Sequence, residues 1–297
     1  MIEYLIGVDG GGTGTRVRLA RAGGAEIAQA SGGPSGLGLG IGKAWAAINE
    51  AAAQAFASAG VKQPAMGSAA IGLGLAGVHN KQWAAEFVAA NPGYAAIVLE
   101  HDGFTTLMGA HQGRPGTIVA IGTGSVGEAL LANGERREVG GWGFPAGDEA
   151  SGGWLGLRAI NHIQQVIDGR KSASAFAQAV IDACGGNRNA IQVWLGTATQ
   201  TSYASLAPIV VAHAATNETA RAMLADAAKE VAGIAAALDP SGTLPMALCG
   251  GLGAPLRAFL PPELLARSVA PQGDAASGAL RMIELHLKEA GNAIPAQ

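Results

Sequence analysis

The chain has 297 residues, of which 49% are hydrophobic, and its formal net charge is −3 at pH 7. This length and apolar content are enough for about two domains, each with its own core. Because the densest basic spot is only the pair Arg136 and Arg137, the composition excludes a surface built for nucleic acid or an anionic membrane and favours a small-molecule partner.

The N-terminal segment and the cysteines bear on the compartment. Glu3 and Asp9 stand where a signal peptide needs positive charge and then an apolar core, and the apolar stretch 66–78 is too short and glycine-rich to span a bilayer. Cys184 and Cys249 are far apart and lack CxxC spacing, so neither a zinc site nor a disulfide framework is indicated. We therefore expect a cytoplasmic protein that does not bind a membrane, with reduced thiols.

The first predicted element is a β-hairpin with a glycine-rich turn, at residues 7–16. Because glycine has no Cβ and tolerates positive φ, backbone N–H groups of such a turn can converge on an anion, and threonine hydroxyls add donors. The turn therefore predicts a phosphate site, and an ordinary hairpin with a loose glycine turn is the alternative. The residues expected to bind phosphate are Gly10, Gly11, Gly12, Thr13, Gly14 and Thr15.

Asp9 stands at the end of the strand that leads into this turn. A carboxylate beside a phosphate is unfavourable unless a cation or its hydration shell lies between them. The sequence therefore predicts Mg²⁺ at this position, held by Asp9 through water.

Helices and strands alternate after the hairpin. Apolar residues at helical spacing predict an amphipathic helix over residues 43–59, ended by Gly60. A buried strand is predicted at residues 68–75, and Asn80 is expected to cap the helix that follows. The next strand is predicted at residues 95–99, close to the end of the first domain.

Two GxGxxG patterns, at residues 72–77 and 122–127, imitate a dinucleotide-binding fingerprint. The first follows a predicted strand, as such a turn does. With 46 glycines in 297 residues, about one match is expected by chance. The patterns therefore carry little weight, and a nicotinamide-dependent dehydrogenase is a minor alternative.

Asp102 follows the predicted strand at residues 95–99. Its carboxylate is expected at the carboxyl end of that strand, where open α/β sheets place their ligands. An aspartate here can also serve only as the cap of the helix that begins near Gly103. His101 beside it is interpreted as a structural neighbour.

Residues 117–127 repeat the layout of the first hairpin: an apolar strand, a turn of Gly, Thr and Ser, and a second apolar run. A hinge is predicted just before it, at residues 111–116, because that segment is polar and broken by Gly and Pro. Two such hairpins are expected if each of two similar domains contributes one phosphate loop to a shared cleft. The phosphate-binding residues expected here are Gly122, Thr123 and Gly124.

The segment 140–151 combines an indole, a carboxylate and several glycines, groups that can together bind a sugar. Trp142 offers a flat apolar face for the C–H side of a pyranose, Asp148 can accept hydrogen bonds from hydroxyls, and the glycines let the backbone approach closely. The alternative makes Trp142 a core residue and Asp148 with Glu149 the start of a helix. The residues expected to contact the sugar are Gly141, Trp142, Gly143 and Asp148.

The remainder is predicted to be mainly helical from 152 to 238. A strand at residues 245–249 returns the chain to a sheet, and a glycine turn follows it. A helix at residues 274–290 is the last predicted element.

These motifs, in this order, resemble the BadF/BadG-type ATPase family of the actin, Hsp70 and sugar kinase superfamily, in particular its N-acetylglucosamine and glucosamine kinases. The stretches that carry the resemblance are VDGGGTGTRVRL from residue 8, EHDG from 100, VAIGTGSVG from 119, GGWGFPAGDEAS from 140, LCGGLG from 248 and PQGDAASGAL from 271. The resemblance implies an α/β fold of two ribonuclease-H-like (actin-like ATPase) domains with a nucleotide- and sugar-binding cleft between them. The expected domains are residues 1–112 and 113–277, with a C-terminal helix, 278–297, packing back toward the first domain.

The resemblance also implies roles for single residues. Asp102 matches the catalytic aspartate, and Trp142 and Asp148 match the family's sugar-contacting residues. Asp274 belongs to the inter-domain connection motif and is expected to stabilise the hinge or a helix start. Family members often carry a sugar-contacting Asn where this chain has Gly36, so either Ser35 substitutes for it or the sugar is held differently. The adenosine motif falls on Gly250, Gly251 and Gly253.

The resemblance implies ATP-dependent phosphorylation of an amino sugar, glucosamine or N-acetylglucosamine, at the 6-hydroxyl, with Mg²⁺ and in a homodimer. Transfer to an alcohol needs a base, which Asp102 can supply, a sugar pocket and a metal. Two alternatives are a nucleotide sensor without an acceptor sugar and an ATP-driven activator of a 2-hydroxyacyl-CoA dehydratase. The activator needs cysteines that hold an iron–sulfur cluster, and neither cysteine lies in a suitable context. The Cys-rich zinc motif of ROK sugar kinases is absent from the sequence.

Overall fold

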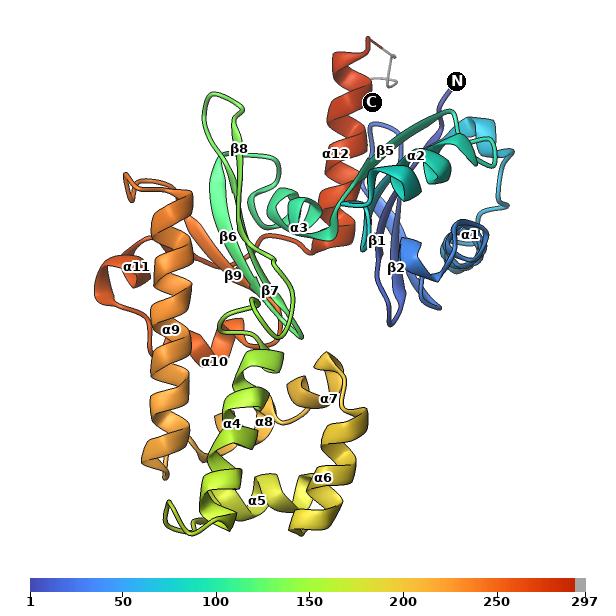
Figure 1. The fold of residues 1–297 in the computed structure, drawn as a ribbon. Coiled ribbons are helices and arrows are strands. Elements are labelled where there is room, and N and C mark those ends of the chain that lie inside the picture. The colour runs from blue at the N-terminus through green and yellow to red at the C-terminus, as the bar shows by residue number, and fades with distance from the viewer. Residues whose placement is uncertain (292–297) are drawn as a thin grey trace. The chain divides into compact units, whose positions relative to one another are not determined.

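The computed structural model describes residues 1–291, and the predicted C-terminal segment 278–297 extends beyond them. The chain forms two compact units (Figure 1). The first consists of Met1–Pro115 together with the chain from Pro271 onward, and the second of Gly116–Ala270. The boundaries expected from the sequence were residues 112/113 and 277/278. The chain returns to the first unit at Pro271, before α12 (Ala275–Glu289) begins, so the whole of this helix belongs to the first unit.

The first unit is built on a sheet of five strands in the order β3-β2-β1-β4-β5. The pairs β1/β2 and β2/β3 are antiparallel, whereas β1/β4 and β4/β5 are parallel. The strands are β1 (Tyr4–Gly10), β2 (Thr15–Arg21), β3 (Glu26–Gly32), β4 (Ala69–Leu75) and β5 (Ala96–Glu100). This mixed pattern brings the carboxyl ends of β1, β4 and β5 to one edge of the sheet.

Helices cover both faces of this sheet because side chains alternate along its strands. Tyr4 and Ile6 pack in one core with Trp45 of α1 (Ile41–Ser58). Leu5, on the opposite face, packs with Ile283 of α12. The first unit also contains η1 (Leu37–Leu39), η2 (Met66–Ser68), α2 (Lys81–Ala89) and α3 (Asp102–His111).

Glycines let α12 lie directly against the sheet. Gly7 of β1 and Gly72 of β4 are register partners, and both face α12. A Cβ on Gly7 would collide with the backbone of Ala276, and one on Gly72 with the backbone of Ala279. Gly72 therefore belongs to the packing of a buried strand, which accounts for the first GxGxxG match without a dinucleotide.

The second unit repeats the same topology. Its strand order is β10-β9-β6-β7-β8, with β6/β7 and β7/β8 antiparallel and β6/β9 and β9/β10 parallel. The strands are β6 (Gly116–Ile121), β7 (Ser125–Leu130), β8 (Arg136–Gly140), β9 (Met246–Cys249) and β10 (Ser268–Val269). Each unit thus begins with an antiparallel hairpin whose turn lies at the carboxyl end of its first strand.

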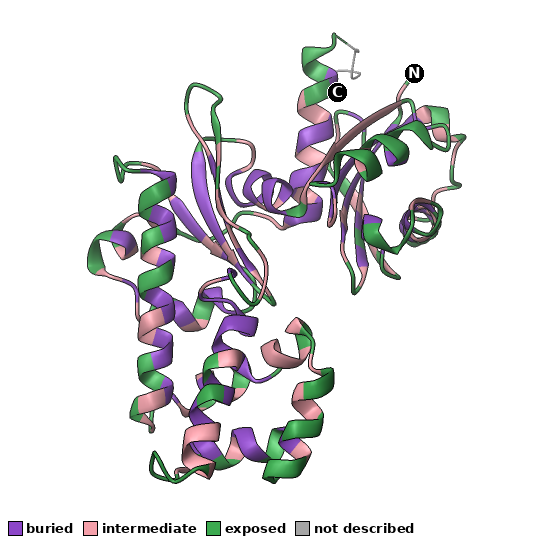
Figure 2. Cartoon of the chain, in the orientation of Figure 1, coloured by how far each residue is buried: buried purple, intermediate pink, exposed green. Residues whose placement is uncertain are grey.

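The second unit carries a long helical segment between β8 and β9, as the sequence predicts. Side-chain caps start most of its helices, and buried positions follow one side of α9 (Figure 2). The helices of this segment are α4 (Gly152–Ile167), α5 (Ala175–Ala183), α6 (Arg188–Thr197), α7 (Gln200–Ala204), α8 (Ala207–His213) and α9 (Glu218–Leu238). Two short helices, α10 (Gly253–Arg257) and α11 (Pro262–Ala266), follow β9.

The predicted elements agree with the structure to within one or two residues at most ends. The helix expected over 43–59 is α1, and the strand expected over 245–249 is β9. Asn80 caps α2, since its side chain accepts hydrogen bonds from the amides of Gln82 and Trp83. Local patterns therefore predicted the elements of this α/β fold well.

Candidate functional site

The turn of the first hairpin is exposed at Gly12 and Thr13. It is closed by a hydrogen bond from the Gly11 amide to the Gly14 carbonyl, at 3.0 Å. The Gly11 carbonyl accepts hydrogen bonds from the amides of Ser35 and Gly36, both at 3.0 Å. In a trans peptide the following N–H points opposite to the carbonyl, so the Gly12 amide is directed away from this loop.

At two positions of this turn, Gly11 and Gly12, nothing in the described residues requires a glycine. A Cβ on Gly11 or Gly12 would meet no heavy atom within 4 Å, and neither residue has a positive φ. Gly10 differs, because a Cβ there would collide with the Ser35 hydroxyl. An open backbone at Gly11 and Gly12 fits a phosphate group that must approach the chain closely.

The structure assigns Thr15 and Ser35 a different place from the one expected. Their side chains are only 2% and 0% exposed, and their hydroxyl oxygens lie 2.7 Å apart. The Thr15 hydroxyl also lies 2.5 Å from the Gly33 carbonyl oxygen. Both hydroxyls are thus used inside the first unit, where they brace the hairpin against the loop that follows β3. The expected contacts of Thr15 with phosphate and of Ser35 with sugar do not fit this burial.

Asp9 lies at the carboxyl end of β1, where its carboxylate is mostly buried. Burial raises the pKa of Asp9 above its ordinary value, Arg16 at 3.6 Å works in the opposite direction, and the charges of Asp102 and Asp274 add to the rise. The carboxylates of Asp102 and Asp274 therefore add negative charge near that of Asp9. A hard divalent cation would relieve this repulsion and prefers oxygen ligands, so the donor set fits Mg²⁺ near Asp9.

Asp102 is exposed at the first position of α3, directly after β5. The cap of this helix is His101, whose Nδ1 accepts a hydrogen bond from the Phe104 amide at 3.3 Å. The interpretation of Asp102 as the helix cap is therefore wrong. One Asp102 oxygen accepts a hydrogen bond from the neighbouring Gly103 amide at 3.0 Å, which orients the carboxylate.

Asp274 caps α12 and receives a bidentate ion pair. Its carboxylate accepts hydrogen bonds from the Ser277 amide at 2.9 Å and from two guanidinium nitrogens of Arg18 at 2.9 and 2.8 Å. Although burial works to raise the pKa of Asp274, the hydrogen bonds from Arg18 and Ser277 bring it below its ordinary value. The predicted role at a helix start is confirmed, and Arg18 is a partner that the sequence reasoning missed.

Backbone amides at the start of α4 donate hydrogen bonds to the turn of the second hairpin. The Gly122 amide closes the turn on the Gly124 carbonyl at 2.9 Å. The Gly122 carbonyl accepts from the Gly152 amide at 2.8 Å, and the Thr123 carbonyl accepts from the Gly153 amide at 3.1 Å. A Cβ on Gly122 would meet nothing within 4 Å. Its backbone is therefore as open to a ligand as that of Gly11 and Gly12.

Asp148 lies behind this second hairpin. Its side chain is 6% exposed, and its carboxylate accepts hydrogen bonds from the Ser125 amide at 3.2 Å and the Gln200 side-chain amide at 2.6 Å. A Cβ on Gly124 would lie 2.8 Å from Asp148 Oδ2. The carboxylate thus supports the hairpin, a contact that the sequence reasoning did not foresee, and its helix-start interpretation is wrong because Ser151 caps α4.

Trp142 is 86% exposed, so the interpretation of this side chain as a core residue is wrong. Its neighbours Gly141 and Gly143 have φ values of 71° and 87°, which favour glycine. A Cβ on Gly147 would lie 2.8 Å from the Trp142 Cβ, so a larger residue there would crowd the ring's base. The segment after β8 thus presents an aromatic face on the surface of the second unit.

The three glycines after β9 differ in what a side chain would meet at each position. Gly250 has a φ of 83°, and a Cβ on it would collide with the Ile121 carbonyl. Gly253 starts α10, with a Cβ position 3.1 Å from the Leu248 side chain. Gly251 is exposed, and a Cβ there would meet nothing within 4 Å. Gly251 is the one of the three whose face is open to a nucleotide.

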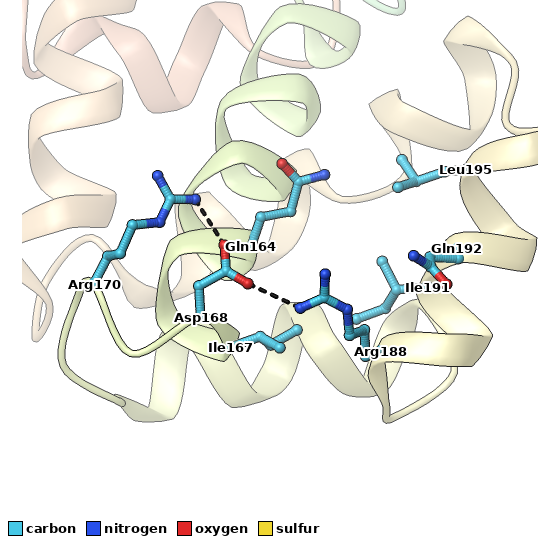
Figure 3. A pocket seen from close by; sticks show the side chains of 8 residues that line it. All are labelled: Gln164, Ile167, Asp168, Arg170, Arg188, Ile191, Gln192 and Leu195. Atoms are coloured by element: carbon cyan, nitrogen blue, oxygen red, sulfur yellow. Dashed lines mark hydrogen bonds and ion pairs between the residues drawn. The ribbon is translucent and has the colours of Figure 1, made fainter.

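A cavity of about 260 Å³ lies in the helical part of the second unit, between α4 and α6 (Figure 3). Asp168 accepts hydrogen bonds there from Arg170 and Arg188, each at 2.9 Å. None of the residues expected to bind nucleotide or sugar lines this cavity. Its two cations are already paired with Asp168, so the site is assigned to the hairpins and not to this cavity.

No helix in residues 1–291 is long and apolar enough to cross a membrane.

Two units with sheets of the same topology, each with an open glycine turn after its first strand, have the fold of the actin-like ATPase class. The chain belongs to the BadF/BadG/BcrA/BcrD ATPase family, whose model matches residues 6–254. The resemblance and the α/β fold expected from the sequence are thereby confirmed.

Similar proteins cover nearly the whole chain. It is 32% identical to a glucosamine kinase of Vibrio cholerae over 281 residues, which span 94% of this chain and 95% of that protein. The crystal structure of a candidate N-acetylglucosamine kinase from Chromobacterium violaceum is 53% identical, with a TM-score of 0.91, over 95% of this chain and 99% of that one. A ROK-family glucokinase from Streptomyces griseus, solved with glucose and AMPPNP, is 17% identical over 95% of this chain and 98% of that one, with a TM-score of 0.53, and shares the fold.

Proposed function

We propose that this protein is an ATP-dependent kinase that phosphorylates the 6-hydroxyl of glucosamine or N-acetylglucosamine. The proposal is supported by whole-length similarity to a glucosamine kinase and by similarity to a candidate N-acetylglucosamine kinase. The single structural observation that carries it is Asp102, an exposed carboxylate at the carboxyl end of β5 that its own helix does not need as a cap. A protein that only senses nucleotide has no use for such a base.

Asp102 is the proposed general base. Its carboxylate accepts the proton of the sugar 6-hydroxyl as that oxygen forms a bond to the γ-phosphorus of ATP and the bond to the ADP oxygen breaks. The hydrogen bond from the Gly103 amide holds one oxygen in place at 3.0 Å, which leaves the second oxygen to accept the proton.

The two hairpins are the proposed phosphate sites. Outward amides next to Gly11, Gly12 and Gly122 supply hydrogen bonds to phosphate oxygens, and the open Cβ positions permit close approach. Asp9 would hold Mg²⁺ through water, and the ion would neutralise charge that develops on the phosphates. Gly251 is the proposed contact for the adenosine part of ATP.

Trp142 is the proposed platform for the sugar. An exposed indole can cover the C–H face of a pyranose, and the adjacent glycine backbone can donate to ring hydroxyls. Asp148 is proposed to act mainly on the hairpin, because two of its acceptor positions are already engaged by Ser125 and Gln200.

The dehydratase-activator alternative conflicts with the cysteines. Cys184 and Cys249 are both buried, and burial raises the pKa of Cys249 to about 12. An iron–sulfur cluster needs thiolates that the metal can reach. The burial of both thiols therefore favours the kinase.

A coupled assay of ADP release tests the proposed function. Glucosamine, N-acetylglucosamine, N-acetylmannosamine and glucose would be compared with Mg²⁺·ATP and without Mg²⁺. We expect the highest kcat/KM with one of the first two sugars and loss of activity without the metal. Nucleotide binding without turnover on any of the four would favour the sensor. Light scattering of the purified protein tests the predicted homodimer, and the cytoplasmic location stays a prediction.

A further inference from the structure

We propose that Gln200 is a positioning residue of the second phosphate hairpin, acting through the Thr123 carbonyl and the Asp148 carboxylate. This inference rests on the proposed function to the extent that the hairpin binds a nucleotide phosphate. Gln200 touches no reacting group in this assignment. It sets the direction of a backbone amide that does.

Gln200 comes from the helical segment and not from the sheet. It is the first residue of α7, directly after Thr199, which forms a reciprocal capping box with Ser202. Its Cγ lies 3.1 Å from the Cβ position of Gly153, at the start of α4. The cap and this close approach fix where the Gln200 side chain begins.

The amide nitrogen of Gln200 has two oxygen acceptors. Nε2 donates to the Thr123 carbonyl at 3.2 Å and to Asp148 Oδ2 at 2.6 Å. A flipped amide would set its own oxygen against these two oxygens, so the orientation is fixed by the partners. Both N–H groups of the side chain are thus engaged.

These contacts determine which way the turn's peptides face. The Thr123 carbonyl is held inward by Gln200 and by the Gly153 amide, at 3.2 and 3.1 Å. Because the carbonyl and the following N–H of a trans peptide point in opposite directions, the Gly124 amide is turned outward. The Gly152 amide does the same for the Thr123 amide by holding the Gly122 carbonyl at 2.8 Å.

Gln200 also restrains a buried charge beside the hairpin. Asp148 is 6% exposed and has a φ of 61°, in the left-handed region that few residues other than glycine adopt. Its oxygens face the Ser125 amide and the Gln200 amide. Removal of the Gln200 donor would leave a nearly buried carboxylate short of a hydrogen bond, next to the turn that is to receive an anion.

The test compares variants of Gln200 with a matched surface pair. Gln200→Met keeps the length but removes the donors, and Gln200→Glu sets a carboxylate against the Thr123 and Asp148 oxygens. Gln178 donates to Asp182 at 2.8 Å on the exposed side of α5, so Gln178→Met breaks the same type of bond away from the hairpin. Gln200→Asn serves as a second variant if Gln200→Met does not fold, because it keeps the amide but shortens its reach.

Nucleotide affinity is measured by calorimetry with AMPPNP and Mg²⁺ in the absence of sugar, alongside KM for both substrates. We expect Gln200→Met to raise the nucleotide Kd and the ATP KM about tenfold and Gln200→Glu to raise them more, the scale of one hydrogen bond to a charged group. The sugar KM should change less than twofold, and Gln178→Met should leave every parameter unchanged.

A nucleotide Kd within twofold of wild type in folded Gln200→Met and Gln200→Glu would overturn the inference. Equal rises in both KM values, in proportion to lost thermal stability, would likewise reduce Gln200 to a packing residue. A wild-type protein that binds nucleotide but phosphorylates no sugar would remove the proposed function alone, and the Kd ratios would still decide the role of Gln200.

Discussion

The first and second hairpins present the same backbone arrangement by different means. In the first, the Gly11 carbonyl is held inward by the Ser35 and Gly36 amides, and a buried pair of hydroxyls lies beneath the turn. In the second, the Gly122 and Thr123 carbonyls are held by the start of α4 and by Gln200, beside a buried carboxylate. The orientation of the peptides is therefore the shared feature, whereas the groups that support the two turns differ.

The side chains that support each turn, which we call its brace, are Thr15 and Ser35 in the first hairpin and Asp148 and Gln200 in the second. The two braces also differ in how far apart in the sequence the bonded residues lie. Thr15 and Ser35 are 20 residues apart, whereas Gln200 is 52 residues from Asp148 and 77 from Thr123. The second hairpin depends on the helical segment between β8 and β9. The first unit has no helical segment of similar length between β3 and β4. Its geometry is accordingly more sensitive to changes far away in the sequence.

The largest expected effect is a loss of kcat without a loss of nucleotide affinity, the property that we assign to the hairpins. Asp102→Asn keeps the shape of the side chain but removes the base, so kcat should fall roughly 10²–10⁴-fold. The nucleotide Kd, which the hairpins determine, should stay within about twofold of wild type. Steady-state kinetics and calorimetry on the same preparation check both. Activity within a few-fold of wild type would take Asp102 out of the mechanism.

The next effect tests whether the two turns are equivalent. Gly11→Val and Gly122→Val add branched side chains at positions where a Cβ meets no protein atom within 4 Å. Both variants should fold, and both should weaken nucleotide binding strongly because the side chain occupies the phosphate's approach. Gly196→Val, at an exposed position of α6 with an equally open Cβ position, is the control. Unchanged affinity in either turn variant would mark that hairpin as a mere turn.

The two braces should differ when their side chains are changed. Asp148→Asn replaces an acceptor oxygen by a donor that faces another donor, Ser125 N–H or Gln200 Nε2, and should cost about 1.5–3 kcal/mol of stability. Ser35→Ala removes one of two buried hydroxyls and should cost about 0.5–1.5 kcal/mol. Urea unfolding measures both. If Ser35→Ala lowered the free energy of unfolding more than Asp148→Asn does, the expectation that the charged side chain contributes more stability than the neutral one would be wrong.

Trp142→Ala sharpens the comparison by leaving both hairpins intact. Loss of the stacking surface, worth about 1–3 kcal/mol, should raise the sugar KM more than the ATP KM. Because the ring is 86% exposed, the melting temperature should hardly change. Substrate titrations and a thermal melt decide it. Equal changes in both KM values would remove Trp142 from the sugar site.

The smallest expected effect on stability concerns Asp9, the charged residue beside the first hairpin. Its pKa is raised mainly by burial, so the folded state holds the ionised form at a disadvantage at neutral pH. Asp9→Asn should therefore raise the melting temperature slightly at pH 7, and the gain should disappear as the pH falls below the ordinary aspartate value, where both states are protonated. The same variant should lose Mg²⁺-dependent activity. A lower melting temperature at pH 7 would contradict the cause assigned to the shift.

Local patterns in the sequence determined the elements and the places where ligands can bind. Alternating and helical spacing, caps such as Asn80, and glycine runs after β1 and β6 predicted strands, helices and turns, because each depends on neighbouring residues. The position of Asp102 after β5 followed from the same reasoning. The glycine pair Gly152 and Gly153, in the first turn of a helix, was a signal of close backbone approach that the sequence analysis did not use.

Only the tertiary structure decided which side chains face a ligand and which support the fold. Thr15 and Ser35 turn inward, and Asp148 reaches Gln200 instead of solvent. Neither result can be read from spacing, because the direction of a side chain in a turn depends on backbone angles such as the φ of 61° at Asp148 and on partners brought together by folding. Hydrogen bonds between residues many positions apart leave no periodic trace in the chain, so the braces of both hairpins appeared only once the sheets and helices were assembled.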